Sequence, residues 1–385
     1  MAQTRAFHAM AKPGGSDCNL RCDYCYYLEK KALYPSDKPR RMNNATLKAY
    51  IKNYIQSSPK GGVVSFAWQG GEPSFMGVAF YAQAVKLQLQ YGAGRTITNS
   101  FQTNGMLLND EWCRFFKKNN FFVGLSLDGP AGIHDEYRKT AQGLPTHHKV
   151  MNALALLQKH GVEYNILACV NQRNFREGVK VYDFFKASGV KFIQFQPVIE
   201  RNATGEVSDF SVPGDGYGQF LADIFDMWVR NDVGKIFVMN FEWALANYMK
   251  TPGSACHHRP TCGRSVVVEH NGDVYSCDRY VCPENLLGNV NETPFSKMLD
   301  SREQEKFGTS KYENLPKSCR KCRVFNGCFG GCKRHRFVSG DGGELNYLCS
   351  GLHKFFTYIT PQMQIMKRLI DAGSSVDRIM DIHII

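Results

Sequence analysis

Hydrophobic and polar positions follow two alternating patterns along the first half of the chain. Short runs rich in β-branched and aromatic residues predict strands at Ala6–Ala11, Val63–Trp68, Ile97–Gln102, Phe122–Leu127, Tyr164–Val170 and Phe192–Gln196. Segments whose apolar residues recur every three or four positions predict helices at Ala45–Ser57, Phe80–Gln90, Glu111–Asn119, His148–His160 and Arg176–Ala187. Because strands that alternate with helices form parallel sheets, these six units predict an α/β fold, a partial (β/α)6 TIM-like barrel.

A change of composition near Thr251 predicts a second domain. Helical patterns at Gly218–Val229 and Phe241–Lys250 precede the change, and a cysteine-rich segment follows it. In that segment Asn271-Gly272 separates two β-branched runs, which predicts a β-hairpin that leads directly to Cys277. Since 385 residues suit two domains, we expect a core domain at 1–250 and a small domain at 251–385 with this hairpin, helices and a C-terminal helix.

Glycines and polar residues follow the predicted strands, at the ends where catalytic groups gather in such folds. Gln69–Pro73 includes two adjacent glycines that let the backbone approach a ligand closely. Gln102–Gly105 follows the next strand, and Ser126 lies at the end of the fourth with Arg138 shortly after it. Taken singly, Gln69–Pro73 is explained better by a tight turn between strand and helix, and Ser126 and Arg138 by a turn and a surface salt bridge.

The 14 cysteines indicate metal sites rather than disulfides. The start of the chain lacks a secretion signal and no run approaches a membrane span of about 18 apolar residues, so we expect a cytoplasmic protein without membrane contact. A reducing cytosol keeps thiols free. Three cysteines cluster near the start and nine lie between Cys256 and Cys349, whereas Cys113 and Cys169 are isolated and are interpreted as packing residues.

Cys18, Cys22 and Cys25 lie on one short loop with no fourth ligand nearby. Three thiolates can hold three irons of a [4Fe–4S] cluster and leave the fourth iron open to a ligand. Structural zinc instead needs four ligands in a closed tetrahedron, and disulfide frameworks belong to small secreted domains. The loop therefore predicts a cluster with one open iron.

The second cysteine group contains a CxxC pair, Cys319 and Cys322, followed by Cys328 and Cys332. This pattern is typical of a metal site, and two structural zinc ribbons are the alternative to iron–sulfur clusters. The net charge of +12 includes eight Lys/Arg and one acid between 311 and 336, interleaved with thiolates. A basic zinc-ribbon protein that binds RNA is thus a rival, although the thiolates argue against a nucleic-acid partner. Iron and sulfide analysis of the purified protein distinguishes iron–sulfur clusters from zinc ribbons.

The first loop, with Tyr24 before its last cysteine, resembles the signature of the radical S-adenosylmethionine (SAM) enzymes, and Gly70–Pro73 resembles their GGEP motif. In these enzymes the amine and carboxylate of SAM bind the open iron. The resemblance implies that Tyr24 and Gly71 touch SAM, that Ser126 and Arg138 help to hold it, and that Ile199 lines the adenine pocket.

The second cysteine group resembles the SPASM domain, which carries up to two auxiliary [4Fe–4S] clusters. Matching of positions implies one cluster on Cys256, Cys262, Cys277 and Cys332, and another on Cys319, Cys322, Cys328 and Cys349. Cys282 is left over. Three [4Fe–4S] clusters are thus expected, of which two are auxiliary.

Gln69–Pro73, Gln102–Gly105, Gly124–Pro130 and Asn271–Asp278 together resemble the anaerobic sulfatase-maturating enzymes. The resemblance implies that a 5′-deoxyadenosyl radical removes a Cβ hydrogen from a Cys or Ser, which is oxidised to Cα-formylglycine. The implied substrate is an unfolded sulfatase precursor with a Cys/Ser-x-Pro/Ala-x-Arg motif, and the implied electron donor is a flavodoxin or ferredoxin. Asp278 matches the base proposed for the family, whereas a solvated hairpin carboxylate is its alternative. A SPASM enzyme that crosslinks or epimerises a ribosomal peptide is the rival within the same fold.

Overall fold

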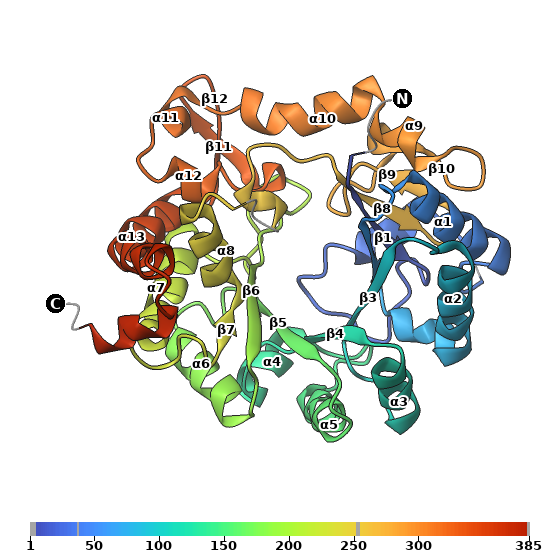
Figure 1. Ribbon diagram of the computed structural model, residues 1–385, viewed down its shortest axis with the longest axis horizontal. Helices are drawn as coiled ribbons and strands as arrows, with labels where there is room; N and C mark the ends of the chain where they lie inside the picture. The colour runs from blue at the N-terminus through green and yellow to red at the C-terminus, as the bar shows by residue number, and fades with distance from the viewer. Residues whose placement is uncertain (1–4, 37, 252–254, 383–385) are drawn as a thin grey trace. The chain divides into compact units, whose positions relative to one another are not determined.

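The computed structural model describes residues 5–36, 38–251 and 255–382, which form two compact units (Figure 1). The first unit comprises the chain up to Ser126, Tyr137–Tyr164 and Gly263–Thr309. The second comprises Leu127–Glu136, Asn165–Cys262 and the chain from Ser310. The two units do not meet at the expected boundary near Thr251, because residues 263–309 pack with the first unit. The domain boundary stays a prediction.

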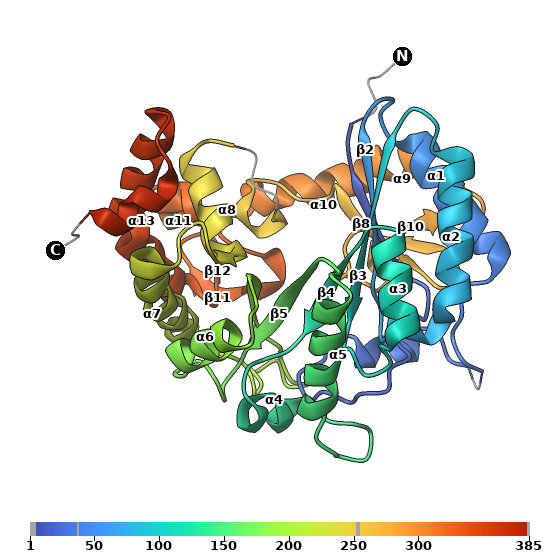
Figure 2. The same ribbon diagram turned by 60° about the horizontal axis from the view of Figure 1, so that its bottom comes forward.

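Seven strands of the first unit form one sheet in the order β10-β9-β8-β1-β2-β3-β4. Its parallel strands are β1 (His8–Lys12), β2 (Val63–Trp68), β3 (Thr96–Thr103) and β4 (Phe121–Ser126). The helices are α1 (Asn44–Ser57), α2 (Gly77–Tyr91), α3 (Asp110–Lys118), α5 (His147–Lys159), α9 (Phe295–Leu299) and most of α10 (Arg302–Glu313). Helices α1, α2 and α3 lie on the same side of the strands (Figure 2), where they cover a fully buried aromatic core that includes Tyr50, Phe66, Trp68, Tyr81 and Phe101.

The predicted hairpin is confirmed, and it extends the sheet. Strands β8 (Ser265–Glu269) and β9 (Asp273–Tyr275) pair antiparallel, and Gly272 in the turn has φ of +95°, which favours glycine. Strand β8 also pairs parallel with β1, and β10 (Leu286–Asn289) adds to the far edge. Successive side chains of a strand point to opposite faces of the sheet, and Val266, Val267 and Val268 of β8 are all buried, so both faces of this strand are covered.

The second unit contains three parallel strands, β5 (Tyr164–Val170), β6 (Phe192–Pro197) and β7 (Phe237–Val238). A separate hairpin consists of β11 (Arg336–Gly340) and β12 (Gly343–Asn346). The helices are α4 (Ala131–Tyr137), α6 (Gly178–Ala187), α7 (Gly214–Asn231), α8 (Met239–Tyr248), α11 (Lys317–Arg320), α12 (Phe325–Cys328) and α13 (Cys349–Asp371). Helices α7 and α13 pack side by side in Figures 1 and 2.

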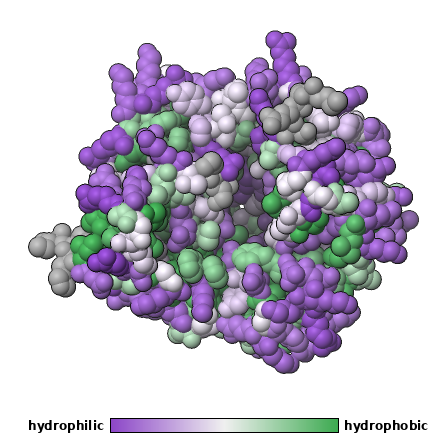
Figure 3. All heavy atoms as spheres, viewed as in Figure 1, coloured by the Kyte–Doolittle hydropathy of each residue, from purple (hydrophilic) through white to green (hydrophobic). Residues whose placement is uncertain are grey.

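The six predicted strands and the helices between them are confirmed to within a few residues, and β2 and β5 have the predicted bounds. Strand β7 has only two residues and α4 only seven, too short for a periodic signal. Among the described residues no helix has the length and apolar character needed to cross a membrane. The face seen in Figure 3 is mostly hydrophilic, with scattered apolar residues.

Candidate active site and cluster ligands

The cysteine loop follows β1 and is partly withdrawn from solvent. Cys22 and Tyr24 are buried, while Cys18 and Cys25 are half-buried. The backbone N–H of Leu20 donates to Cys18 Sγ at 3.4 Å, as a backbone amide does to a metal-bound sulfur. Burial raises the pKa of the Cys18 thiol to about 12. A buried thiolate here therefore needs a positive partner, which the irons of a cluster provide.

Glu72, four residues after β2, links two of the predicted motifs to this loop. Its buried carboxylate accepts hydrogen bonds from Thr103 Oγ1 and the Asn104 backbone N–H, both at 2.8 Å. Asn104 Nδ2 in turn lies 2.7 Å from Asn19 Oδ1 and 3.6 Å from Cys18 Sγ. Residues 69–73 and 102–105, which the sequence placed at separate strand ends, thus form one network that holds the first cysteine.

Gly71 packs directly against the chain that leads into the cysteine loop. Its N–H donates to the Gly15 carbonyl at 2.7 Å, and the next N–H, of Glu72, donates to the Asp17 carbonyl at 2.8 Å. A Cβ at Gly71 would lie 2.1 Å from the Asp17 carbonyl oxygen, so no other residue fits without moving the backbone. This contact explains the glycine within the chain, and the SAM contact of Gly71 stays a prediction.

The structure brings Tyr24 and Arg138 together. The Arg138 guanidinium lies 5.5 Å from the centroid of the Tyr24 ring, and both side chains are buried. Thr146 Oγ1 donates to the Arg138 carbonyl at 2.7 Å and anchors this segment. At the end of β4, Ser126 Oγ accepts from Gln102 Nε2 at 3.0 Å. Both pairs of predicted residues therefore belong to the first unit.

Ile199 belongs to the second unit, where it follows β6. Its side chain is buried and lines a hollow of about 310 Å³ together with Arg201, Arg334 and Phe337. The guanidinium of Arg201 lies 5.1 Å from the Phe337 ring centroid. The contact of Ile199 with adenine stays a prediction.

Asp278 is enclosed by donors and cations of the first unit. Its Oδ2 accepts from the Tyr26 hydroxyl at 2.8 Å, and its Oδ1 lies 3.5 Å from Cys277 Sγ. Burial alone raises the pKa of this carboxyl, but the charges of Lys12 and Arg279 and the Tyr26 hydrogen bond outweigh it and lower the pKa below its usual value. The carboxylate is thus ionised and able to accept a proton.

The sequence did not reveal two partners of Asp278, Lys12 and Tyr26. The ammonium of Lys12 lies 3.6 Å from the centroid of the Tyr27 ring, and burial lowers its pKa. The Tyr27 hydroxyl donates to Glu269 of β8. A lysine only 1% exposed at the end of a core strand is a signal of a buried charge partner, but the partner lies more than 250 residues away in sequence.

The second unit gathers most of the predicted auxiliary ligands. Cys319, Cys322 and Cys349 lie close enough to Cys328 that, after burial, their charges help to raise its pKa to about 12. Among the residues that the structure describes, no three Cys, His, Asp or Glu side chains converge to hold a single metal ion. In a [4Fe–4S] cluster each thiolate binds its own iron, so its ligands need not converge on one point.

Cys256, Cys262 and Cys332 surround a buried cation, Lys311. Its ammonium donates to the carbonyls of Cys256 at 2.9 Å and His257 at 3.2 Å. Burial lowers the pKa of Lys311 to about 8, although the three thiols oppose this shift. Cys277, the fourth ligand implied for this set, belongs to the first unit, so the set as a whole stays a prediction.

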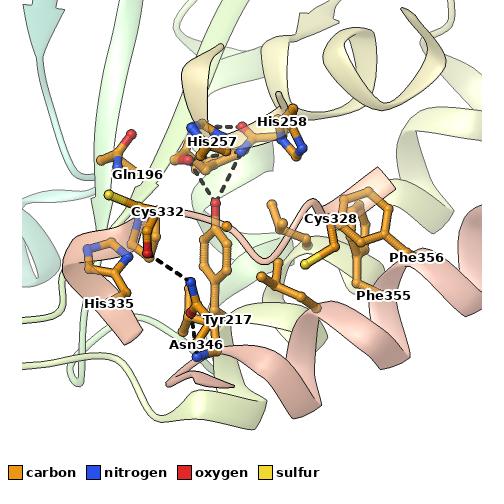
Figure 4. Close-up of a pocket in the computed structure, with 17 residues that line it drawn as sticks. Gln196, Tyr217, His257, His258, Cys328, Cys332, His335, Asn346, Phe355 and Phe356 are labelled. Atoms are coloured by element: carbon orange, nitrogen blue, oxygen red, sulfur yellow. Dashed lines mark hydrogen bonds between the residues drawn. The ribbon is translucent and has the colours of Figure 1, made fainter. Parts of the chain in front are cut away.

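Members of both predicted auxiliary sets line one cavity of about 60 Å³ (Figure 4). Cys328 and Cys332 lie on its wall with the imidazoles of His257, His258 and His335. His258 Nδ1 pairs with the Gly327 carbonyl at 2.8 Å, and burial lowers its pKa to about 4, which keeps the ring neutral. The sequence did not indicate these histidines as site residues, because they lie near the cysteines in the chain but do not show the spacing typical of metal-binding histidines.

Comparison with known proteins decides the family. Residues 13–185 match the radical SAM superfamily, and residues 256–323 match the SPASM iron–sulfur cluster-binding domain. A serine-type anaerobic sulfatase-maturating enzyme of Bacteroides thetaiotaomicron is 43% identical over 94% of this chain and 92% of the relative. The chain belongs to the anaerobic sulfatase-maturating enzymes. It is therefore a radical SAM enzyme with an iron–sulfur cluster-binding domain.

Other members of the anaerobic sulfatase-maturating family agree with this. A cysteine-type enzyme of Clostridium perfringens is 34% identical over 92% of this chain and 96% of the relative. The solved structure of native anSMEcpe with bound AdoMet and Cp18Cys peptide has a TM-score of 0.86 at 33% identity and covers 95% of this chain and all of that one. The predicted radical SAM barrel with a C-terminal SPASM domain is thereby confirmed. Membership of this family favours iron–sulfur clusters over zinc ribbons.

Proposed function

We propose that this protein oxidises a Cys or Ser of a sulfatase precursor to Cα-formylglycine in the absence of oxygen. The observation that carries the proposal is similarity over more than nine-tenths of the chain to both serine-type and cysteine-type enzymes of the family. The substrate is an unfolded sulfatase or a peptide with a Cys/Ser-x-Pro/Ala-x-Arg motif. The reaction needs reduced thiols and a low-potential flavodoxin or ferredoxin, which suits the cytoplasm.

Three [4Fe–4S] clusters and SAM are the cofactors of the proposed reaction, with the ligand sets already described. SAM and its cluster supply the 5′-deoxyadenosyl radical, which takes a hydrogen atom from the target Cβ. The residues around the cysteine loop suit this group. Three thiols on one loop would leave one iron of a cluster open, and Tyr24 of that loop forms a packed aromatic and cation pair with Arg138.

Asp278 acts as the base in this proposal. Once Cβ has lost a hydrogen atom, the thiol or hydroxyl of the target loses its proton to this carboxylate and a second electron leaves, which gives a thioaldehyde or an aldehyde. Tyr26 fixes one carboxylate oxygen by its hydrogen bond of 2.8 Å. The ionised state favoured by Lys12 and Arg279 suits a group that must accept a proton.

Replacement of Asp278 tests this role. The Asp278→Asn variant keeps the shape of the side chain but loses a general-base contribution of about 10²–10⁴ in rate. We expect 5′-deoxyadenosine to form without matching formylglycine, measured by chromatography and by mass spectrometry of a peptide that carries the target motif. A Cys peptide should suffer less than a Ser peptide, because a thiol is more acidic than an alcohol.

Asp273→Asn is the matched control, since Asp273 lies on the same hairpin but bonds to the Tyr34 hydroxyl at 3.0 Å. It should keep the parent ratio of the two products. If Asp278→Asn converts either peptide at the parent rate with normal coupling, the base lies elsewhere. If the parent protein makes no formylglycine in any such peptide while it cleaves SAM, the proposed function itself is wrong.

A further inference from the structure

A basic groove of about 730 Å³ lies on the second unit. Its walls are the end of α8, the segment 258–261, the segment 323–329 and part of α13. Lys250, Arg259 and Arg323 line it and are exposed. Among the described residues no Asp or Glu is part of the lining. An open, concave surface with one sign of charge attracts a partner of the opposite sign.

The groove is built on the same loop as the predicted ligands of the second auxiliary cluster. Val324, Gly327 and Phe329 form part of its wall, between and beside Cys322 and Cys328. The N–H of Cys328 donates to the Val324 carbonyl at 3.1 Å, so a wall residue and a ligand share a backbone hydrogen bond. A molecule bound in the groove would therefore contact residues that are close in sequence to the predicted cluster ligands.

The positive charge continues along the chain beyond the groove. Arg320 and Lys321 are exposed and flank Cys319 and Cys322, next to Arg323. Carboxylates also lie near this segment, and Asp223 and Asp226 of α7 line a second hollow together with Arg323. Asp341 accepts from the Ser318 N–H and hydroxyl and offsets Lys317, whereas Glu313 contributes only its backbone carbonyl to Arg320. We call Lys250, Arg259, Arg320, Lys321 and Arg323 the basic face.

We propose that the basic face binds an acidic one-electron carrier protein of the flavodoxin or ferredoxin class. The inference rests on the proposed function, in which the target loses two electrons. One leaves with the hydrogen atom taken from Cβ, while Asp278 takes the proton. The other would reduce the oxidised carrier by one electron, by way of the cluster that Cys319, Cys322, Cys328 and Cys349 would hold. Encounters between redox proteins are weak and steered by charge, which an exposed cationic surface beside cluster ligands suits.

Charge complementarity selects this occupant over the substrate. The target motif carries an arginine, which a cationic face repels. Nucleic acid shares the negative charge of the carrier, but its binding does not require proximity to redox ligands. RNA binding is therefore the outcome that competes with the proposal in the test.

The test uses the full-length protein with its clusters and a recombinant bacterial flavodoxin as the probe. The double variant Arg259→Glu/Arg323→Glu reverses two charges of the basic face. Lys180→Glu/Lys235→Glu reverses two exposed charges on helix α6 and just after α7, and is the matched control. Calorimetry at low and moderate salt should show about tenfold or greater loss of affinity for the first variant and a flatter salt dependence, with little change for the control.

Iron content and SAM cleavage with a chemical reductant should stay at the parent level in both variants, which separates docking from damage to the clusters. Equal affinity of the basic-face variant and the parent for flavodoxin overturns the proposal, and so does an equal loss in the control. Tighter binding of a single-stranded RNA than of flavodoxin, abolished by the same two substitutions, also overturns it. Formylglycine production with a small-molecule one-electron mediator such as methyl viologen, whose oxidised form accepts the second electron, tests the proposed function separately, since that assay contains no carrier protein.

Discussion

Glu72 belongs to a motif that resembles a cofactor contact, yet its side chain accepts hydrogen bonds from other residues of the protein. Burial raises the pKa of this carboxyl, and hydrogen bonds from Ser74, Thr103 and Asn104 oppose the shift. Each of these donors would be left without an acceptor if the carboxylate were removed. The residue therefore links the ends of β2 and β3 to the loop that holds Cys18.

We expect Glu72→Gln to weaken this link although it changes size little. A glutamine amide places an NH₂ group against one of the three donors, which costs about 1–3 kcal/mol of unfolding free energy. Urea unfolding followed by circular dichroism measures the loss, and iron analysis should show less iron retained. Glu111→Gln, on the exposed face of α3, is the control and should leave both unchanged. An unchanged free energy of unfolding in Glu72→Gln would show that this hydrogen-bond network does not contribute to stability.

At the residue scale the sequence indicated candidate ligands and a candidate base, but not the side chains that surround them. Cysteine spacing and recognised motifs identified the candidate ligands and Asp278. Lys12 and Tyr26 were missed because their roles depend on contacts with residues more than 240 positions away. No local pattern carries such information.

Helices α7 and α13 meet where two glycines face each other. A Cβ at Gly218 would lie 2.0 Å from the Gly351 carbonyl oxygen, so the backbones touch at this point. Helix α13 begins at Cys349, two residues before Gly351. The close packing of these helices therefore fixes the position of a predicted cluster ligand.

Gly218→Ala should disturb this packing. Overpacking of a tight contact costs about 1–3 kcal/mol, which outweighs the better helix propensity of alanine. Gly132→Ala in α4 is the matched control, because nothing lies within 4 Å of the added methyl group. We expect a lower urea midpoint and less iron for Gly218→Ala, and a midpoint equal to or above the parent for Gly132→Ala. A higher urea midpoint for Gly218→Ala than for Gly132→Ala would mean that α7 and α13 accept the added methyl group without loss of stability.

Element types were predictable from periodicity, but the pairing of β8 with β1 was not. Hydrophobic period and the Asn271-Gly272 turn are local signals, and they gave the barrel strands and the hairpin correctly. The pairing of β8 with β1 joins residues about 255 positions apart. Only the tertiary structure shows that the hairpin completes the sheet of the first unit.

At the scale of the whole molecule, the return of 263–309 to the first unit explains how Asp278 meets its partners. Strand β8 brings Glu269 to Tyr27, and the residues after β9 bring Asp278 to Tyr26. The segment that carries Cys277 is thus held by the sheet. The other ligands implied for its cluster, Cys256, Cys262 and Cys332, belong to the second unit.

Ligation of a cluster by Cys277 should contribute to the stability of the protein, because metal ligation is coupled to folding. We expect Cys277→Ala to remove up to about four irons and to lower the denaturation temperature of the anaerobically purified protein.

Cys282→Ala is the matched control. Cys282 lies five residues later, and its sulfur accepts from Asn285 Nδ2 at 3.1 Å within its own turn. Cys282 Sγ also lies 3.8 Å from the Tyr280 carbonyl. These local contacts need no metal, so Cys282→Ala should keep the parent iron content and lose only the small stabilisation of weak sulfur hydrogen bonds. Iron and sulfide assays with calorimetry compare the two variants. Equal iron loss in both would mean that Cys282 shares the ligation and that the auxiliary sets must be redrawn.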